Sequence, residues 1–198
     1  MFGTAALASF PLSIQKALAI DAKVESGTIQ DVKHIVILTQ ENRSFDNYFG
    51  TLKGVRGFGD RFTIPMTEGR KVWEQYDANK KKVLPYHLDS RLGNAQRVTG
   101  TNHSWSDGQG AWDNGRMSDW VAHKQPQSMG YYKKQEVEYQ FALANAFTIC
   151  DAYHCAMHAG TNPNRKFIWT GTNGPTGAGV ASVVNEFDGI GPSTRVLE

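Results

Sequence analysis

Two short polar stretches combine residue types that can hold a cation and attack phosphorus. Glu41 and Asn42 follow an apolar run directly, and a carboxylate beside a carboxamide offers the oxygen ligands that Mg²⁺, Ca²⁺ or Mn²⁺ prefer. Thr161 stands just before Asn162 and Pro163, where a helix is expected to begin and to favour an anion such as phosphate. A metal or a base would make its hydroxyl a nucleophile. Taken alone, the spacing favours ordinary helix capping at both places.

Histidines and cysteines form two weaker candidate sites. His103 lies in a polar loop, where an imidazole can bind an anion or act as an acid, although such a residue is more often simply exposed. Residues 150–158 contain two cysteines and two histidines, but their interleaved order differs from the paired ligands of structural zinc sites. Buried thiols and packing histidines are the favoured reading. A disulfide between Cys150 and Cys155 stays open if the protein is exported.

The segments that must position these residues alternate between strand and helix patterns. Residues 34–40 form a continuous apolar run rich in β-branched side chains, which is typical of a strand buried on both faces of a parallel sheet. Ser44 is a plausible N-cap for a short helix after it. An antiparallel excursion is expected over residues 63–88, with its turn at 77–79, followed by loops and short helices over 92–124.

Three later segments complete the expected pattern. Residues 136–146 predict a helix with its apolar side chains on one face, and 147–150 predict a second short buried strand. Residues 163–170 predict a helix with Asn162 as its N-cap and Gly171 at its end. Alternating strands and helices with loop insertions indicate an α/β layered domain.

The composition excludes several classes of protein. The chain has 198 residues, and its 21 Lys and Arg residues against 19 Asp and Glu residues give a formal net charge of only +2. So small an excess provides little attraction for polyanions, and we expect no nucleic-acid partner. Intrinsic disorder is not expected, because 40% of the residues are hydrophobic and five are Trp. Two cysteines are too few for a disulfide-rich scaffold.

The N-terminal residues differ from the rest of the sequence. Residues 1–19 are rich in Ala, and Ala17-Leu18-Ala19 has the small-x-small pattern that signal peptidase accepts. Pro11 and Lys16 interrupt the segment, which makes it too short to span a bilayer. We interpret residues 1–19 as a truncated export signal and residues 20–198 as the N-terminal part of a catalytic domain; a flexible tail is the alternative.

The stretch from His34 to Phe58 is very similar to the signature region of the bacterial phosphoesterase family, which contains non-haemolytic and haemolytic phospholipases C and a related acid phosphatase. The long run Glu41-Asn42-Arg43-Ser44-Phe45-Asp46 is the specific part of this likeness. Agreement continues over residues 102–105, 115–120, 129–132, 146–155 and 161–165. The Ala-rich leader also resembles the end of a twin-arginine export signal, which implies a periplasmic or secreted protein.

The resemblance implies a fold, a reaction and roles for four residues. The fold would be an alkaline-phosphatase-like α/β/α sandwich, of which this chain is an incomplete N-terminal portion. Glu41 and Asn42 would be ligands of a divalent metal ion such as calcium or magnesium. Thr161 would be both the nucleophile and a third ligand, and His103 would lie near the phosphate. The substrate would be a phospholipid or another phosphate ester, with transient contact to a membrane surface.

The family completes its metal site with acidic residues further along the chain, and Glu186 and Asp188 stand too early in the sequence for that role. One carboxylate, one amide and one hydroxyl are a poor cage for a divalent ion. We therefore expect a phospholipase C that cleaves phosphatidylcholine-like lipids through a phosphothreonine, with this chain alone inactive. The alternatives are an acid phosphatase on the same scaffold and a non-catalytic secreted domain that binds choline or sugar through its Trp-rich loops.

Overall fold

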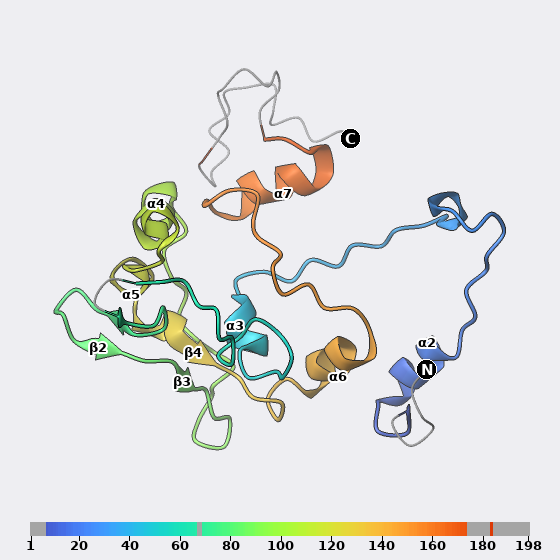
Figure 1. The fold of residues 1–198 in the computed structure, drawn as a ribbon, viewed down its shortest axis with the longest axis horizontal. Helices are drawn as coiled ribbons and strands as arrows, with labels where there is room; N and C mark the ends of the chain where they lie inside the picture. Colours follow the sequence, from blue (N-terminus) through green and yellow to red (C-terminus); the bar gives the residue numbers. More distant parts are fainter. Residues whose placement is uncertain (1–6, 67–68, 174–182, 184–198) are drawn as a thin grey trace. The chain divides into compact units, whose positions relative to one another are not determined.

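The computed structural model describes residues 7–66, 69–173 and 183, and these fall into two compact units (Figure 1). Unit 1 consists of Met1–Gly59 and Tyr132–Asp151, and unit 2 consists of Asp60–Tyr131 and Ala152–Glu198. Each unit therefore draws on two separate parts of the sequence. In the described part of the chain, no helix is long and apolar enough to cross a bilayer.

Unit 1 is built from short helices. They are α2 (Leu12–Leu18), a 3-10 helix (Ile29–Asp31), α3 (Phe45–Phe49) and α6 (Glu138–Ala146). The expected N-cap of α3 is confirmed, because the hydroxyl of Ser44 accepts the N–H of Asn47 at 3.2 Å. The expected helix over 136–146 is also confirmed as α6, although it begins at Glu138.

The core of unit 1 forms where α6 meets its neighbours. The Phe141 side chain is buried on α6, and its ring lies 6.0 Å from that of Phe49 on α3. On the other side, α2 packs against α6 and buries Ile14 almost completely. The N–H of Tyr132 donates to the carbonyl of Asn47 at 2.8 Å, which ties the segment before α6 to α3. Aromatic packing and one backbone bond thus join the two sequence parts of this unit.

Two expected strands of unit 1 are wrong. Residues 34–40 are extended but belong to no strand, and Ile35, Val36 and Leu38 are 79%, 91% and 85% exposed. Residues 147–150 are likewise outside any strand, and Phe147 is exposed. A strand needs a partner for its N–H and C=O groups, and no strand among the described residues pairs with either segment. The apolar pattern therefore predicted neither the pairing nor the burial of these segments correctly.

The described residues of unit 2 form two small sheets, each of two strands. Strand β1 (Gln75–Tyr76) pairs antiparallel with β2 (Lys82–Val83), with Gln75 opposite Val83. This confirms the predicted excursion and its turn, where the carboxylate of Asp77 accepts the N–H of Asn79 at 2.9 Å. Strand β3 (Tyr86–His87) pairs parallel with β4 (Gly130–Tyr131).

The helices of unit 2 are short, as expected for residues 92–124. They are α4 (Trp105–Trp112), a 3-10 helix (Asp113–Gly115), α5 (Trp120–Lys124), a 3-10 helix (Pro126–Met129) and α7 (Thr161–Thr170). Helices with small sheets are compatible with an α/β chain. The α/β/α sandwich stays a prediction, because the described strands do not form its central sheet.

A buried carboxamide joins β1 to the segment before α5. Gln75 is 1% exposed, and its side-chain Nε2 donates to the carbonyls of Val72 at 2.5 Å and of Met117 at 2.8 Å. Its Oε1 accepts the N–H of Trp120 at 3.0 Å. Both amide hydrogens and the carbonyl are used, so the group lies inside the unit without an unsatisfied polar atom.

We predict that Gln75→Ala lowers the free energy of unfolding by about 2 kcal/mol, because the Met117 carbonyl and the Trp120 N–H both lose their partner at a partly buried place. Urea unfolding followed by circular dichroism measures the loss. Gln127→Ala is the control, because that side chain makes a 3.4 Å bond to the Gly100 carbonyl at an exposed site. Equal effects of the two variants would contradict the assignment.

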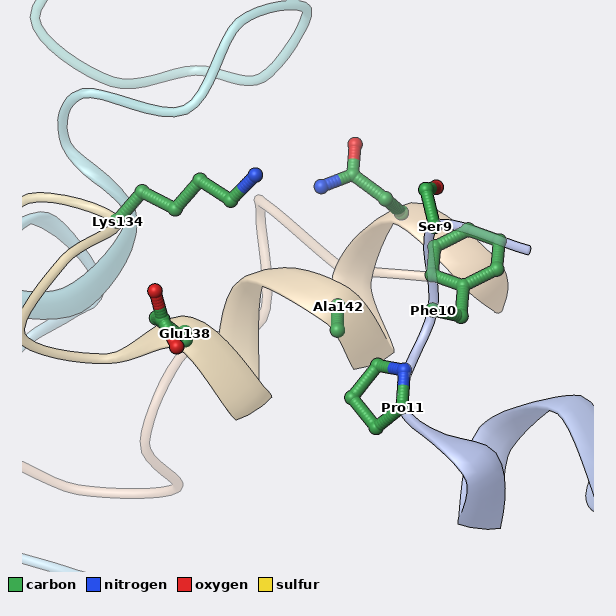
Figure 2. A pocket seen from close by; sticks show the side chains of 7 residues that line it. Ser9, Phe10, Pro11, Lys134, Glu138 and Ala142 are labelled. Atoms are coloured by element: carbon green, nitrogen blue, oxygen red, sulfur yellow. The ribbon is translucent and has the colours of Figure 1, made fainter. Parts of the chain in front are cut away.

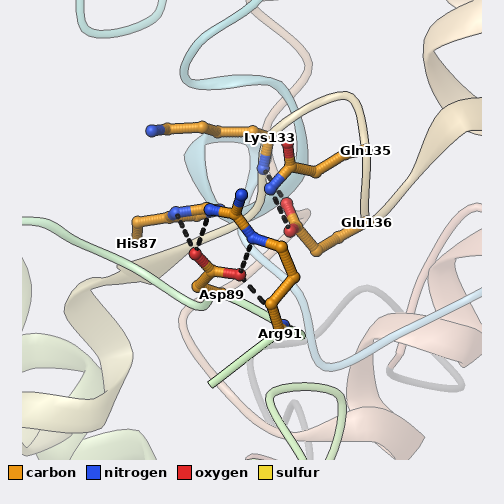
Figure 3. A network of polar contacts seen from close by, with 6 residues as sticks. All are labelled: His87, Asp89, Arg91, Lys133, Gln135 and Glu136. Atoms are coloured by element: carbon orange, nitrogen blue, oxygen red, sulfur yellow. Dashed lines mark hydrogen bonds and ion pairs between the residues drawn. The ribbon is translucent and has the colours of Figure 1, made fainter. Parts of the chain in front are cut away.

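An ion pair follows β3 directly. The carboxylate of Asp89 accepts Nε of Arg91 at 2.9 Å and lies 3.9 Å from Nδ1 of His87 (Figure 3). The hydrogen bonds from the Arg91 side chain hold the pKa of Asp89 well below its ordinary value of 3.8. In unit 1, the same figure shows Glu136, whose carboxylate accepts the backbone N–H of Lys133 at 2.9 Å.

Because the pKa of Asp89 is lowered on folding, the stability that its charge adds is present above pH 3.8 and is lost as the pH falls further. We expect the wild-type chain to unfold at a higher urea concentration than Asp89→Asn at pH 7. The difference should shrink steadily below about pH 4, since the Asp89 carboxyl of the unfolded wild-type chain then takes up a proton while that of the folded chain stays ionised. A difference between the two proteins that stays constant from pH 7 to pH 2.5 would refute this origin.

Candidate functional site

Glu41 and Asn42 lie in unit 1, in the bend between the exposed segment 34–40 and α3. Both residues are exposed. Asn42 has a φ of +64°, a left-handed conformation that Asn tolerates better than most residues. The guanidinium of Arg43 donates to the Asn42 carbonyl at 2.6 Å. The bend connects the exposed segment to α3. It leaves the Glu41 carboxylate and the Asn42 carboxamide, which are adjacent in sequence, both accessible to solvent.

Thr161 lies in unit 2 as the first residue of α7, and Gly160 is the N-cap. The helix thus begins two residues earlier than expected, and the prediction of Asn162 as N-cap is wrong. Pro163 is fully buried in the first turn, where the missing N–H removes no intrahelical bond. The predicted end of the helix is confirmed, because Gly171 has a φ of +73° and caps it. Thr161 therefore carries its hydroxyl at the positive end of a ten-residue helix.

The loop that leads to Thr161 packs closely against α4. A Cβ atom on Gly108 would lie 2.4 Å from the carbonyl oxygen of His158, so only glycine permits this approach. The ring of His158 lies 5.0 Å from that of Trp112, and its Nδ1 is 3.3 Å from Nε2 of Gln109. Trp112 thus packs on the imidazole three residues before Thr161.

His103 belongs to the same unit as Thr161 and lies exposed in the loop directly before α4. The hydroxyl of Ser104 caps this helix by accepting the N–H of Asp107 at 3.2 Å. The structure therefore places Thr161 and His103 in unit 2, and Glu41 and Asn42 in unit 1.

Next to His103 lies a polar cluster that the sequence did not predict. Hydrogen bonding from the Ser104 hydroxyl lowers the pKa of the Asp107 carboxyl, and its Oδ1 lies 3.8 Å from Nδ1 of His123 on α5. Nζ of Lys124 donates to the carbonyl of Asn102 at 2.7 Å, and burial lowers its pKa. His123 stands 16 positions after Asp107, and no local pattern joins His123 and Lys124 to residues 102–107.

The cysteine and histidine stretch carries no metal site in the structure. Cys150 and Cys155 are both exposed and free, so the favoured prediction of buried thiols is wrong. Across residues 7–66 and 69–173, no group of three or more His, Cys, Asp or Glu side chains is arranged to hold a metal ion. Glu186 and Asp188 lie outside the described residues. The side chains at positions 41, 42 and 161 all offer oxygen atoms, the type of ligand that calcium and magnesium ions prefer.

One cavity of unit 1 lies between residues 9–11 and α6 (Figure 2). It has a volume of about 740 Å³. Its polar lining comes from Ser9, Lys134, Glu138 and Asn145. The four predicted site residues are not among the lining residues, so this cavity is separate from the chemistry inferred from the sequence.

Gly108→Ala tests the contact between α4 and the loop. Alanine alone would favour the helix by about 1 kcal/mol, but the added Cβ meets a backbone oxygen that has to move away. We expect a net loss of unfolding free energy of about 1 kcal/mol or more, and a changed near-ultraviolet circular dichroism signal from Trp112. Gly93→Ala is the control, since nothing lies within 4 Å of its added Cβ. A stabilised Gly108→Ala protein would refute the contact.

Comparison with known proteins agrees with the motif likeness. The sequence profile of the Phosphoesterase family matches residues 32–194. The chain is 57% identical over 190 residues to the Non-hemolytic phospholipase C of Pseudomonas aeruginosa, covering 96% of this chain and 27% of that protein. It is 46% identical over 170 residues to the Hemolytic phospholipase C of the same organism, covering 86% and 23%.

A more distant relative is also a phospholipase C. Phospholipase C B of Mycobacterium tuberculosis is 35% identical over 172 residues, which covers 78% of this chain and 33% of that protein. The chain thus spans about a quarter to a third of the length of these relatives. Since the family profile covers most of the sequence, the chain belongs to the Phosphoesterase family.

Proposed function

We propose that this chain supplies part of the catalytic machinery of a metal-dependent phosphoric ester hydrolase. Membership of the Phosphoesterase family supports the reaction class, and the relatives named phospholipase C support a phospholipid substrate. The specific proposal is a phospholipase C that releases diacylglycerol and a phosphorylated head group from phosphatidylcholine-like lipids. Because the chain spans 27% of the first of these relatives, this activity is assigned to a protein of the relatives' length.

The placement of Thr161 carries the proposal. Its hydroxyl stands on the first residue of α7, where backbone N–H groups without an intrahelical partner favour a phosphate group. In the proposed reaction, Oγ1 forms a bond to phosphorus while the bond from phosphorus to the glycerol oxygen breaks. The glycerol oxygen takes up a proton and leaves as diacylglycerol. Water then hydrolyses the phosphothreonine and restores the hydroxyl.

Four residues have proposed roles around the phosphate. Glu41, Asn42 and Thr161 would hold a divalent cation, calcium or magnesium, through their oxygen atoms. A bound cation supplies positive charge that favours the alkoxide of threonine and balances charge on the phosphate oxygens. His103 is proposed to contact the phosphate from the loop before α4, where its exposed ring is accessible to a substrate.

Export and membrane contact belong to the same proposal. Residues 1–19 would belong to a twin-arginine-type export signal, and the exported protein would touch membranes only transiently. In the structure, α2 (Leu12–Leu18) packs on α6 and buries Ile14, so removal of the signal would expose this face of α6. No nucleic-acid partner is proposed, in keeping with the formal charge of +2.

We predict that Thr161→Ala lowers turnover by roughly a thousandfold or more, because the nucleophile is lost. The test uses a protein of the relatives' length that contains this chain, with p-nitrophenyl phosphorylcholine as substrate. Thr170→Ala, at the other end of α7, is the matched control, because its hydroxyl bonds only at that end, to the carbonyls of Lys166 and Thr172 and to the N–H of Thr172. Retained activity of Thr161→Ala would exclude this residue as nucleophile.

The same assay separates the proposed phospholipase from its alternatives. Preference for p-nitrophenyl phosphate over the phosphorylcholine diester would instead identify a phosphatase. Choline or sugar binding without turnover of either substrate, and unaffected by Glu41→Ala, would identify a non-catalytic binding domain.

A further inference from the structure

We infer that Asn164 is a positioning residue, whose carboxamide fixes the backbone that leads into Thr161. The inference rests on the proposed role of Thr161 as the nucleophile. Asn164 lies in the first turn of α7, three residues after Thr161, and its side chain reaches back to the preceding loop, residues 157–160. We call these four residues the nucleophile loop.

One carboxamide makes four hydrogen bonds to the nucleophile loop. Its Oδ1 accepts the N–H of Met157 at 3.2 Å. The two hydrogens of its Nδ2 are shared among three carbonyls, those of Met157 at 3.2 Å, Ala159 at 3.0 Å and Gly160 at 3.0 Å. Three of the four residues of the loop are therefore bound through their backbone to a single side chain.

This arrangement replaces the usual cap of a helix start. The N-cap, Gly160, has no side chain that could accept a backbone N–H. The third helical residue is Pro163, which has no N–H to offer to such a cap. Neither of the common capping contacts can therefore form at this junction. Asn164, the fourth residue of the helix, instead holds the loop from inside the first turn.

The rest of the loop is held by other parts of unit 2. The carboxamide Nδ2 of Asn173, a residue only 4% exposed, lies 3.0 Å from Sδ of Met157. The His158 carbonyl packs against Gly108, where an added Cβ would come within 2.4 Å. Each residue of the nucleophile loop thus has at least one identified contact that restricts it. Motion of the loop would also displace Thr161, because Thr161 is the next residue.

Only a carboxamide meets these requirements. The position needs an acceptor and two N–H donors on one planar group, which Asn provides and Asp does not. An ionised Asp would place a second oxygen against three carbonyl oxygens and would push the loop away from the helix. An Ala would leave the carbonyls unbound and the loop free to move. A misplaced nucleophile is costly, because a shift of about 1 Å can lower a rate by about a hundredfold.

The experiment compares Asn164→Ala and Asn164→Asp in a protein of the relatives' length that contains this chain. We expect kcat to fall by roughly ten- to a hundredfold in Asn164→Ala, with KM changed by less than about threefold. Asn164→Asp should lose more. Hydrogen exchange at the amides of Met157 to Thr161 should become faster in both variants, because the loop has lost its hydrogen-bonded support.

The matched control is Asn145→Ala on α6, where the carboxamide donates to the carbonyl of Phe141 at 2.7 Å and touches no part of the nucleophile loop. It should change neither kcat nor exchange at residues 157–161. If Asn164→Ala does not fold, Asn164→Ser replaces it, since the hydroxyl keeps one donor and one acceptor and should give an intermediate loss of kcat.

The outcomes separate this inference from the proposed function. Wild-type kcat in Asn164→Ala, or unchanged exchange at the loop amides, overturns the positioning role. A rise in KM with unchanged kcat overturns it as well, since that result indicates substrate binding. If Thr161→Ala and the wild-type protein are equally active, the proposed nucleophile fails, while exchange at the loop amides still decides whether Asn164 holds the loop.

Discussion

The described parts of this chain depend on side chains to satisfy backbone hydrogen bonds. Their four strands are only two residues long, so strand ladders serve few of the N–H and C=O groups in the connecting segments. Carboxamides and carboxylates take over that task. Gln75 joins β1 to the segment before α5, Asn164 holds the loop before Thr161, and Asp31 accepts the N–H groups of Ser26 and Gly27.

This dependence explains why the nucleophile loop can be well defined without regular structure. Fixing the backbone of one residue costs about 1–2 kcal/mol of conformational entropy. A loop held only by exposed contacts would not offset this cost and would therefore move. Here, Asn164 and Gly108 restrict the loop from α7 and from α4. Both helices belong to unit 2, so the support for Thr161 is complete within that unit. Glu41 and Asn42 depend on a different support, the bend before α3 in unit 1.

Much of the local structure could be predicted from the sequence. The helix after Ser44, the excursion around residues 77–79 and the end of α7 at Gly171 were all indicated by residues that act on their immediate neighbours. The start of α7 was placed two residues late, because Pro163 is acceptable at several positions of a first turn. The contacts of Asn164 could not be predicted in this way, since an Asn in the first turn of a helix indicates nothing about which distant groups it binds.

The sequence by itself determined family membership, because the motif from Glu41 to Asp46 and the residues around Thr161 carry it in their order along the chain. It also determined where α3, α6 and the turn at residues 77–79 lie, since caps, apolar periodicity and turn residues act over a few positions. Only the tertiary structure decided that residues 34–40 are exposed, that β3 pairs with β4, and that Asn164 holds the nucleophile loop. Burial and strand pairing depend on tertiary contacts between segments that are far apart in the sequence. The residue types within one segment do not specify which other segment it contacts.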